Sequence, residues 1–190
     1  MMKRFIFSLA LLTFCVFGVQ AQTAGVGLKA GLNLANIGGG DLSSGKTRTG
    51  IHAGLMGAFG LAPGVFLQPE LQFSMQGEGV RDTDEELHLT YIHIPVMAKV
   101  MLGEVFNLQF GPYGSFRVGD VKGGDATLRE SWNSFDAGVG LGLGVGDASG
   151  FTVDARYLYG LTSVNDAQKF EGAGNRLLQL SVGYFFGGNR

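Results

Sequence analysis

The chain has 190 residues, of which 33 are glycine and only 16% are charged, and its formal net charge at pH 7 is −2. This length corresponds to a single domain. The weakly acidic balance argues against nucleic acid as a partner, because nucleic-acid-binding proteins present a basic patch. So little charge together with so much glycine also argues against an ordinary soluble domain.

Residues 1–21 have the features of a secretory signal peptide: two basic residues, a short apolar stretch and a small-residue cleavage site that ends at Ala21. The apolar stretch is shorter than the roughly 20 residues that a transmembrane helix needs. Cleavage would remove two of the 14 basic residues and none of the 16 acidic ones, which leaves a net charge of −4. It would also remove Cys15, the only cysteine, so we expect no disulfide or thiolate site in the mature domain, 22–190.

In the mature domain, eight segments alternate apolar and polar side chains with a period of two, which indicates strands with one apolar face. We expect strands at 26–35, 49–61, 67–76, 89–102, 105–119, 134–146, 151–161 and 175–186. Each is about long enough to cross a bilayer when tilted, and the connections alternate strictly between long and short. In outer-membrane barrels the short turns face the periplasm and the long loops face outside. The sequence therefore predicts an all-β fold, an eight-stranded antiparallel up-and-down transmembrane β-barrel.

The two faces of these strands differ in a way that separates a membrane barrel from a soluble, lipocalin-like barrel with the same strand number. A solvated outer face would carry many Lys and Glu residues, but the polar face is mostly Gly, Ser, Gln and Asn. The apolar face has aromatic residues toward strand ends, as in interfacial girdles: Phe106, Phe116, Phe135, Phe151, Tyr157, Tyr159 and Tyr184. The last strand ends with Tyr184 and Phe186, similar to the terminal aromatic signal for insertion. We therefore place the apolar face against outer-membrane lipid.

The most regular segment is 134–146, where one face is apolar and the other is mainly glycine. The glycine face consists of Gly138, Gly140, Gly142 and Gly144. Glycine weakens a strand interior, so this face needs a reason. We interpret it as space in a narrow lumen, filled by a larger side chain such as Tyr113, Arg117 or Arg156. A phosphate-binding loop is excluded, because the glycines occupy alternate positions of one strand with no helix after them.

The polar faces of the other strands supply a set of charged and phenolic groups whose charges nearly cancel. The expected lumen network is Lys29, Glu70, Lys99, Tyr113, Arg117, Asp136, Asp154 and Arg156. Eight strands leave an interior just wide enough for side chains, so we interpret this set as a satisfied polar core rather than a selective ion path. Arg117 and Asp136 lie near the outer ends of neighbouring strands and are expected to pair.

Two other groups of polar residues give only weak evidence for a metal site or for catalysis. The acidic segment 77–88 lacks an organised spacing of calcium ligands. His52, His88, Ser134 and Asp136 fall near the outer rim, but catalysis requires hydrogen-bond contact between base and nucleophile, and the second and sixth strands lie on opposite walls. We expect no catalytic residue, no metal and no cofactor.

Four motifs carry a family resemblance: YIHIPVMAK at 91–99, GPYGSF at 111–116, FDAG at 135–138 and RYLYGL at 156–161. With them the whole mature chain resembles the PorT-like, outer-membrane β-barrel-domain family of Gram-negative envelopes. His93 is a departure, since relatives often have an acidic residue there. The resemblance implies an outer-membrane barrel that tolerates prolines in mid-strand. Pro95 and Pro112 lack ladder donors, so we expect bulges at both.

The function that these observations favour is a structural or surface-interaction role carried by the four outer loops, because loops on a rigid scaffold carry function. The alternative is a small-solute channel; an outer-rim membrane enzyme and a soluble lipocalin-like binder are less favoured. The expected partners are outer-membrane lipid, the barrel-assembly machinery during insertion and an extracellular partner that the sequence does not identify. We expect a monomer.

Overall fold

The computed structural model describes residues 24–38, 48–79, 86–118, 135–146, 149–163 and 174–186. These residues form eight strands. Their bounds are β1 (Ala24–Gly38), β2 (Arg48–Ala62), β3 (Val65–Gly79), β4 (Glu86–Leu102), β5 (Phe106–Arg117), β6 (Phe135–Val145), β7 (Phe151–Ser163) and β8 (Gly174–Phe186). The proposed signal peptide lies outside the described residues. Within the described part, no helix is long and apolar enough to cross a membrane.

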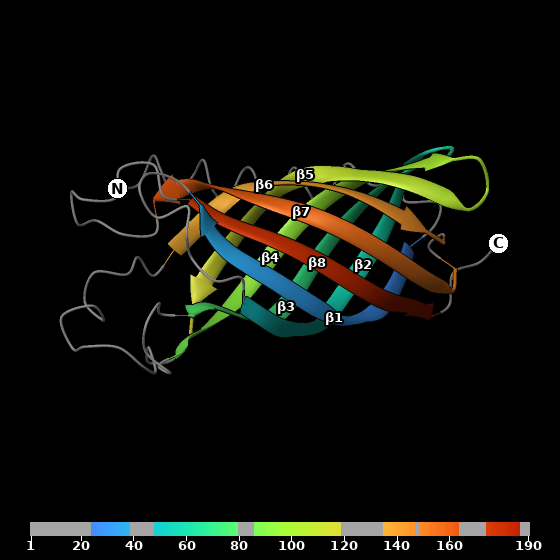
Figure 1. The fold of residues 1–190 in the computed structure, drawn as a ribbon. Coiled ribbons are helices and arrows are strands. Elements are labelled where there is room, and N and C mark those ends of the chain that lie inside the picture. Colours follow the sequence, from blue (N-terminus) through green and yellow to red (C-terminus); the bar gives the residue numbers. More distant parts are fainter. Residues whose placement is uncertain are drawn as a thin grey trace, which may run out of the picture.

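The strands pair antiparallel in chain order and close into a barrel, because β1 also pairs with β8 from Val26↔Phe186 to Gly38↔Gly174 (Figure 1). Closure leaves no strand with unpaired backbone groups at an edge. The eight-stranded antiparallel barrel predicted from the sequence is confirmed. The expected strand bounds agree to within a few residues, and the largest difference at a strand start is β4, which begins at Glu86.

Short connections lie at one end of the barrel, where β2 meets β3, β4 meets β5 and β6 meets β7 (Figure 1). Three glycines in these turns have left-handed backbone conformations: Gly64 (φ 73°), Gly103 (φ 73°) and Gly146 (φ 101°). Only glycine adopts such angles without a steric cost from Cβ. The remaining connections, 39–47, 80–85, 118–134 and 164–173, join strands at the opposite end, and all but Val118 lie outside the described residues.

Side chains alternate between an apolar outer face and a polar interior. On the outer face of β6, Leu141 and Leu143 are 65% and 63% exposed. On the inner faces, Glu70 and Arg156 are 3% and 1% exposed. This is the reverse of a water-soluble protein, whose charged groups are almost never fully buried. It contradicts the lipocalin-like alternative and matches a barrel whose outer surface meets hydrocarbon.

Aromatic rings mark both ends of the outer face. At the end with the short turns, the Tyr184 ring packs against Phe151 and Phe186, with centroid distances of 4.8 and 5.2 Å. At the other end, Phe116 and Phe135 are paired across β5 and β6, with their centroids 5.1 Å apart. Two aromatic groups at opposite ends are the arrangement that stabilises a barrel at the two membrane interfaces.

The bulges expected at the two mid-strand prolines are absent, and this prediction was wrong. The β3–β4 register is the same on both sides of Pro95, and the β4–β5 and β5–β6 registers are the same on both sides of Pro112. The β3–β4 ladder lacks the pair of Pro95, and the β4–β5 ladder lacks the pair of Pro112, while each proline keeps its pair with the strand on its other side. The missing N–H donor therefore interrupts pairing without adding a residue. The register shifts of the described strands occur instead in β2 at residues 60–62 and in β7 at residues 159–163.

Candidate functional site

The centre of the lumen holds a closed cluster of four charges, two of each sign. Glu70 on β3 accepts from Lys29 Nζ on β1 at 3.3 Å and from Arg156 Nη2 on β7 at 2.6 Å. Asp154 on β7 meets the same two cations: it accepts a hydrogen bond from Lys29 Nζ at 2.9 Å and forms an ion pair with Arg156, whose Nε lies 3.0 Å from Oδ1. We call these four residues the ion square. Each charge faces two of the opposite sign, so the cluster is neutral as a whole.

Three neutral amides complete the ion square. Gln68 Nε2 donates to Glu70 at 2.6 Å, and the Gln72 amide donates to the other carboxylate oxygen of Glu70. On the opposite side, Arg156 Nε donates to Gln109 Oε1 at 2.6 Å. A buried ion pair is favourable only if further hydrogen bonds satisfy its remaining donors and acceptors, and these amides supply them.

The ion square crosses the lumen from wall to wall. In a closed barrel of eight strands, β3 and β7 are four strands apart in either direction and therefore face each other. The 2.6 Å contact between Glu70 and Arg156 joins these two walls. Side chains thus fill the section of the barrel at this level, as the small diameter of an eight-stranded barrel predicts.

Beyond the ion square, toward the end with the long connections, a second network is built from neutral groups. His52 Nδ1 lies 2.8 Å from Asn33 Oδ1, and His52 Nε2 lies 3.0 Å from Ser181 Oγ. Asn33 Nδ2 donates to Ser74 Oγ at 3.0 Å, and Gln179 Nε2 donates to Asn33 Oδ1 at 3.2 Å. These contacts join β1, β2, β3 and β8, so this part of the lumen is also bridged between strands.

A third group of contacts is formed around Asp136 on β6. Tyr113 donates its hydroxyl to Asp136 Oδ2 at 3.2 Å, and the Thr162 hydroxyl donates to Oδ1 at 2.8 Å. The β5–β6 register places Ser115 directly opposite Asp136, so Arg117 lies diagonal to this carboxylate, within reach of a long side chain. The expected pairing of Arg117 with Asp136 stays a prediction. On its other side Arg117 lies opposite Tyr91 of β4, and its buried Nη1 has no hydrogen-bond partner among the described residues.

The last expected member of the network, Lys99 on β4, lies apart from the ion square. Its side chain is buried, with Nζ 6.0 Å from the centroid of the Phe185 ring. Phe185 points into the barrel from β8, between the outward rings of Tyr184 and Phe186. The structure therefore groups four of the eight expected residues in the ion square, joins two others as Tyr113 and Asp136, and leaves Lys99 and Arg117 elsewhere on the inner wall.

The glycine face of β6 lies against side chains of β5 and β7. A Cβ added at Gly138 would lie 2.7 Å from Tyr113 Cε1, and one at Gly142 would lie 2.7 Å from Arg156 Cγ. At Gly140 and Gly144 the nearest atoms are Leu158 Cδ2 at 2.6 Å and Asn107 Oδ1 at 2.7 Å. Real Cβ atoms essentially never approach other atoms this closely, so the four glycines are there for volume.

Sequence reasoning missed the amides and histidines that connect the network. Gln68, Gln72 and Gln109 were visible as inward polar positions, but nothing in the sequence distinguished them from other neutral residues. His93 also points inward, where its Nδ1 lies 2.6 Å from Ser115 Oγ. The only signal for these residues was their position on the inward-facing side of a strand, and glycines and serines occupy the same positions.

No catalytic or metal-binding constellation is formed by the described residues. His52 contacts Asn33 and Ser181 rather than Asp136. The side chains of the other two rim candidates, His88 and Ser134, lie outside the described residues. Nor does that part of the chain bring together three or more His, Cys, Asp or Glu residues that could hold a metal ion.

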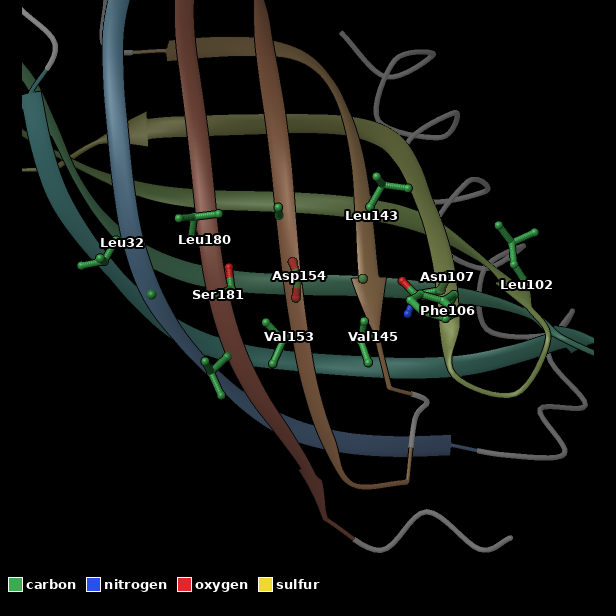
Figure 2. A pocket seen from close by; sticks show the side chains of 14 residues that line it. Leu32, Leu102, Phe106, Asn107, Leu143, Val145, Val153, Asp154, Leu180 and Ser181 are labelled. Carbon is green, nitrogen blue, oxygen red and sulfur yellow. The ribbon is translucent and has the colours of Figure 1, made fainter.

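The outer surface carries an apolar groove of about 770 Å³. Figure 2 shows its labelled lining side chains, which come from β4 around the wall to β1 and include Leu32, Leu102 and Phe106. Asp154 also lines the groove, but its carboxylate is held inside by the ion square. The groove is thus part of the membrane-facing surface, and the polar lumen is the better candidate for a functional element.

A closed barrel with an apolar outer wall, two aromatic girdles and a filled polar lumen is a small integral protein of the bacterial outer membrane. Residues 20–166, which include β1 to β7, match the model of the outer membrane protein β-barrel domain family. The chain belongs to this family, and its location is the outer membrane.

Solved structures to which the chain is similar include two structures of one small outer-membrane protein and one of another. Ail of Yersinia pestis in a phospholipid nanodisc is 16% identical, with a TM-score of 0.51 over 86% of this chain and 99% of that chain. Ail in complex with the heparin analogue sucrose octasulfate is 15% identical, with a TM-score of 0.49 over 86% and 98%. Neisserial surface protein A is 16% identical, with a TM-score of 0.47 over 85% and 95%. No curated protein matches the chain.

Proposed function

We propose that this protein has a structural or surface-interaction role at the outer membrane, with a lumen that does not conduct and four outer connections that carry its contacts. The observation that supports the proposal is the ion square, which joins opposite walls through Glu70 and Arg156. The connections concerned are 39–47, 80–85, 118–134 and 164–173. Their composition differs from that of the strands, and loops on a rigid scaffold are where binding residues concentrate.

An ion entering the lumen would have to separate charges that are already paired and buried. Removing one partner from a buried pair costs about 3–5 kcal/mol, and here each charge has two partners. The ion square is also neutral, so it offers no excess charge that would attract either sign of ion. A small-solute channel therefore has less support than a closed barrel.

Planar-bilayer recording tests the closed lumen. The refolded wild-type protein should show no steady, large openings, and the double substitution of Glu70 and Arg156 by serine should introduce them by removing the wall-to-wall contact. A matched control, Leu141→Ser, changes the lipid-facing side of the same barrel and should stay closed if it inserts. Steady wild-type openings would instead support the small-solute channel.

The surface role is tested separately, by replacing each of the four outer connections with a short glycine-serine turn. A pull-down from envelope extracts should lose its partner with at least one replacement, while heat-modifiable gel migration shows that the barrel still forms. If all four replacements retain the same partners, the contacts are made by the barrel wall. No turnover is expected; loss of an activity on phospholipid or peptide substrates in His88→Ala or Ser134→Ala would support a rim enzyme.

The proposal includes several narrower expectations. The assignment to the PorT-like branch of the family is supported by the motifs at 91–99, 111–116, 135–138 and 156–161. We also propose that residues 1–21 are removed, that the assembly machinery recognises Tyr184 and Phe186, and that the protein is a monomer. Both terminal aromatic side chains point outward at the end of β8, where they are accessible before the strand is inserted.

A further inference from the structure

The outer wall carries a single charge among the described strand residues. Among the described side chains, the positions that face outward on the eight strands hold apolar residues, glycine, proline or threonine, with one exception. The exception is Arg176 on β8, which is exposed. A charge facing hydrocarbon is destabilising to an extent that depends on its depth and falls toward zero near the interfaces. The depth of Arg176 therefore decides what it does.

Arg176 lies one membrane thickness away from the girdle at the short turns. Ten residues of β8 separate it from Phe186. At about 3.4 Å per residue and a tilt of about 40°, ten residues rise roughly 26 Å along the barrel axis. The apolar band of such barrels is about 25 Å tall. Arg176 is thus at the opposite boundary of the hydrocarbon, at the end with the long connections, which is the outer leaflet.

A neighbouring ring orients the guanidinium. Tyr159 on β7 is the register partner of Arg176, and its ring centroid lies 5.8 Å from Arg176 Cζ. Both side chains are exposed on the outer face. Among the described residues, no ion pair or hydrogen bond engages the guanidinium, and its contact is with the Tyr159 ring. The register shift of β7 begins directly beyond this pair.

We propose that Arg176, held against Tyr159, binds the anionic phosphate headgroup of an outer-leaflet lipid. The guanidinium presents a planar fork of donors that matches phosphate oxygens, and stacking on an aromatic face leaves that fork free. The site is at the depth of the headgroups, where a cation near the surface favours an anionic lipid.

Native mass spectrometry of the full refolded barrel tests this site. The protein in neutral detergent is offered equal amounts of phosphatidylglycerol and phosphatidylcholine with identical chains. The wild type should retain the anionic lipid about fivefold in excess, the preference expected for one cation at a membrane surface. Arg176→Gln should bring the ratio close to one, and Tyr159→Leu should reduce it by loosening the guanidinium. Tyr157→Leu is the matched control and should leave it unchanged.

Four results would overturn the proposal. A wild-type ratio close to one would show that there is no preference, and this measurement needs no variant to fold. An unchanged ratio in Arg176→Gln would place the preference elsewhere. Loss of the preference for the anionic lipid on adding excess inorganic phosphate would mean that the site binds free phosphate rather than a lipid. Retention of a second copy of the chain in place of lipid would likewise replace the lipid with a protein contact.

Discussion

Adding one methyl group to the glycine face should destabilise the barrel, and Gly142→Ala is the sharpest case. A Cβ at this position would lie 2.7 Å from Arg156 Cγ and 2.8 Å from the carbonyl oxygen of Ala155. The carbonyl belongs to the β6–β7 ladder and cannot move without breaking it. The arginine stem can move only by shifting its guanidinium, which forms ion pairs with Glu70 and Asp154 and a hydrogen bond with Gln109.

The magnitude follows from a comparison with Gly114→Ala on the outer face. A Cβ at Gly114 would lie 3.5 Å from Phe135 Cε2, which is ordinary van der Waals contact. Both substitutions stiffen the unfolded chain by a similar amount, about 0.4–1 kcal/mol, so this contribution cancels between them. The remaining difference is the overpacking at Gly142, which costs about 1–3 kcal/mol.

The assay is equilibrium urea unfolding in lipid vesicles, followed by the shift between folded and unfolded bands on a gel without heating. Gly142→Ala should lose about 1–3 kcal/mol of unfolding free energy relative to Gly114→Ala. Equal stabilities would refute the reasoning, because they would mean that the lumen beside Arg156 has room for a methyl group. A larger loss in Gly114→Ala would mean that the two faces of the sheet are reversed.

Further predictions concern the same lumen. Gly140→Leu should overpack the interior by roughly 1–3 kcal/mol or more and lower the refolding yield, whereas Val139→Leu on the lipid face should be nearly silent; equal yields would argue against a crowded lumen. Glu70→Ala should cost about 3–5 kcal/mol, because it leaves two buried cations short of a carboxylate; a loss below about 1 kcal/mol in urea unfolding would show that water replaces it. Tyr113→Phe should cost about 1–2 kcal/mol by removing the hydrogen bond to Asp136, and an unchanged midpoint would show that this bond contributes nothing.

The barrel itself was predictable, because alternation with a period of two is a local property of each strand. Once Leu141 and Leu143 are assigned to the outer face, Gly140 and Gly142 must face the lumen. The order of long and short connections then fixes the direction of each strand. None of these steps requires knowing which residues of neighbouring strands lie opposite each other.

The pairing of side chains inside the lumen depends on register, which the sequence does not determine. Arg117 and Asp136 have the right charges at the right end of neighbouring strands, but Phe116 pairs with Phe135, and this places Ser115 opposite the carboxylate. Arg117 is therefore diagonal to Asp136, and only a register different by two residues would have placed the two directly opposite each other. The ion square is harder still, because its members come from β1, β3 and β7, and only the closed circumference brings these strands to face each other.

The prolines show a second limit of the sequence. A proline in mid-strand removes one donor, and either a bulge or an omitted ladder pair can absorb the loss. Pro95 and Pro112 take the second course, and the register continues on both sides. The choice depends on the two neighbouring strands, which hold the backbone in line, and not on the residues next to the proline.

The sequence distances within the ion square have a consequence for how the barrel is made. Lys29 and Asp154 are 125 residues apart, and Arg156 and Glu70 are 86 apart. Contacts of such separation form late, because each requires closing a long loop of chain. Before β7 approaches β1 and β3, each of these charges lacks one of its two partners, and an isolated hairpin carrying Lys29 or Glu70 lacks both, which would be costly in hydrocarbon. Hairpins therefore cannot be inserted one at a time with these charges bare. We expect the chain to cross the membrane as a nearly complete cylinder, in a single slow step that ends when its charges neutralise one another.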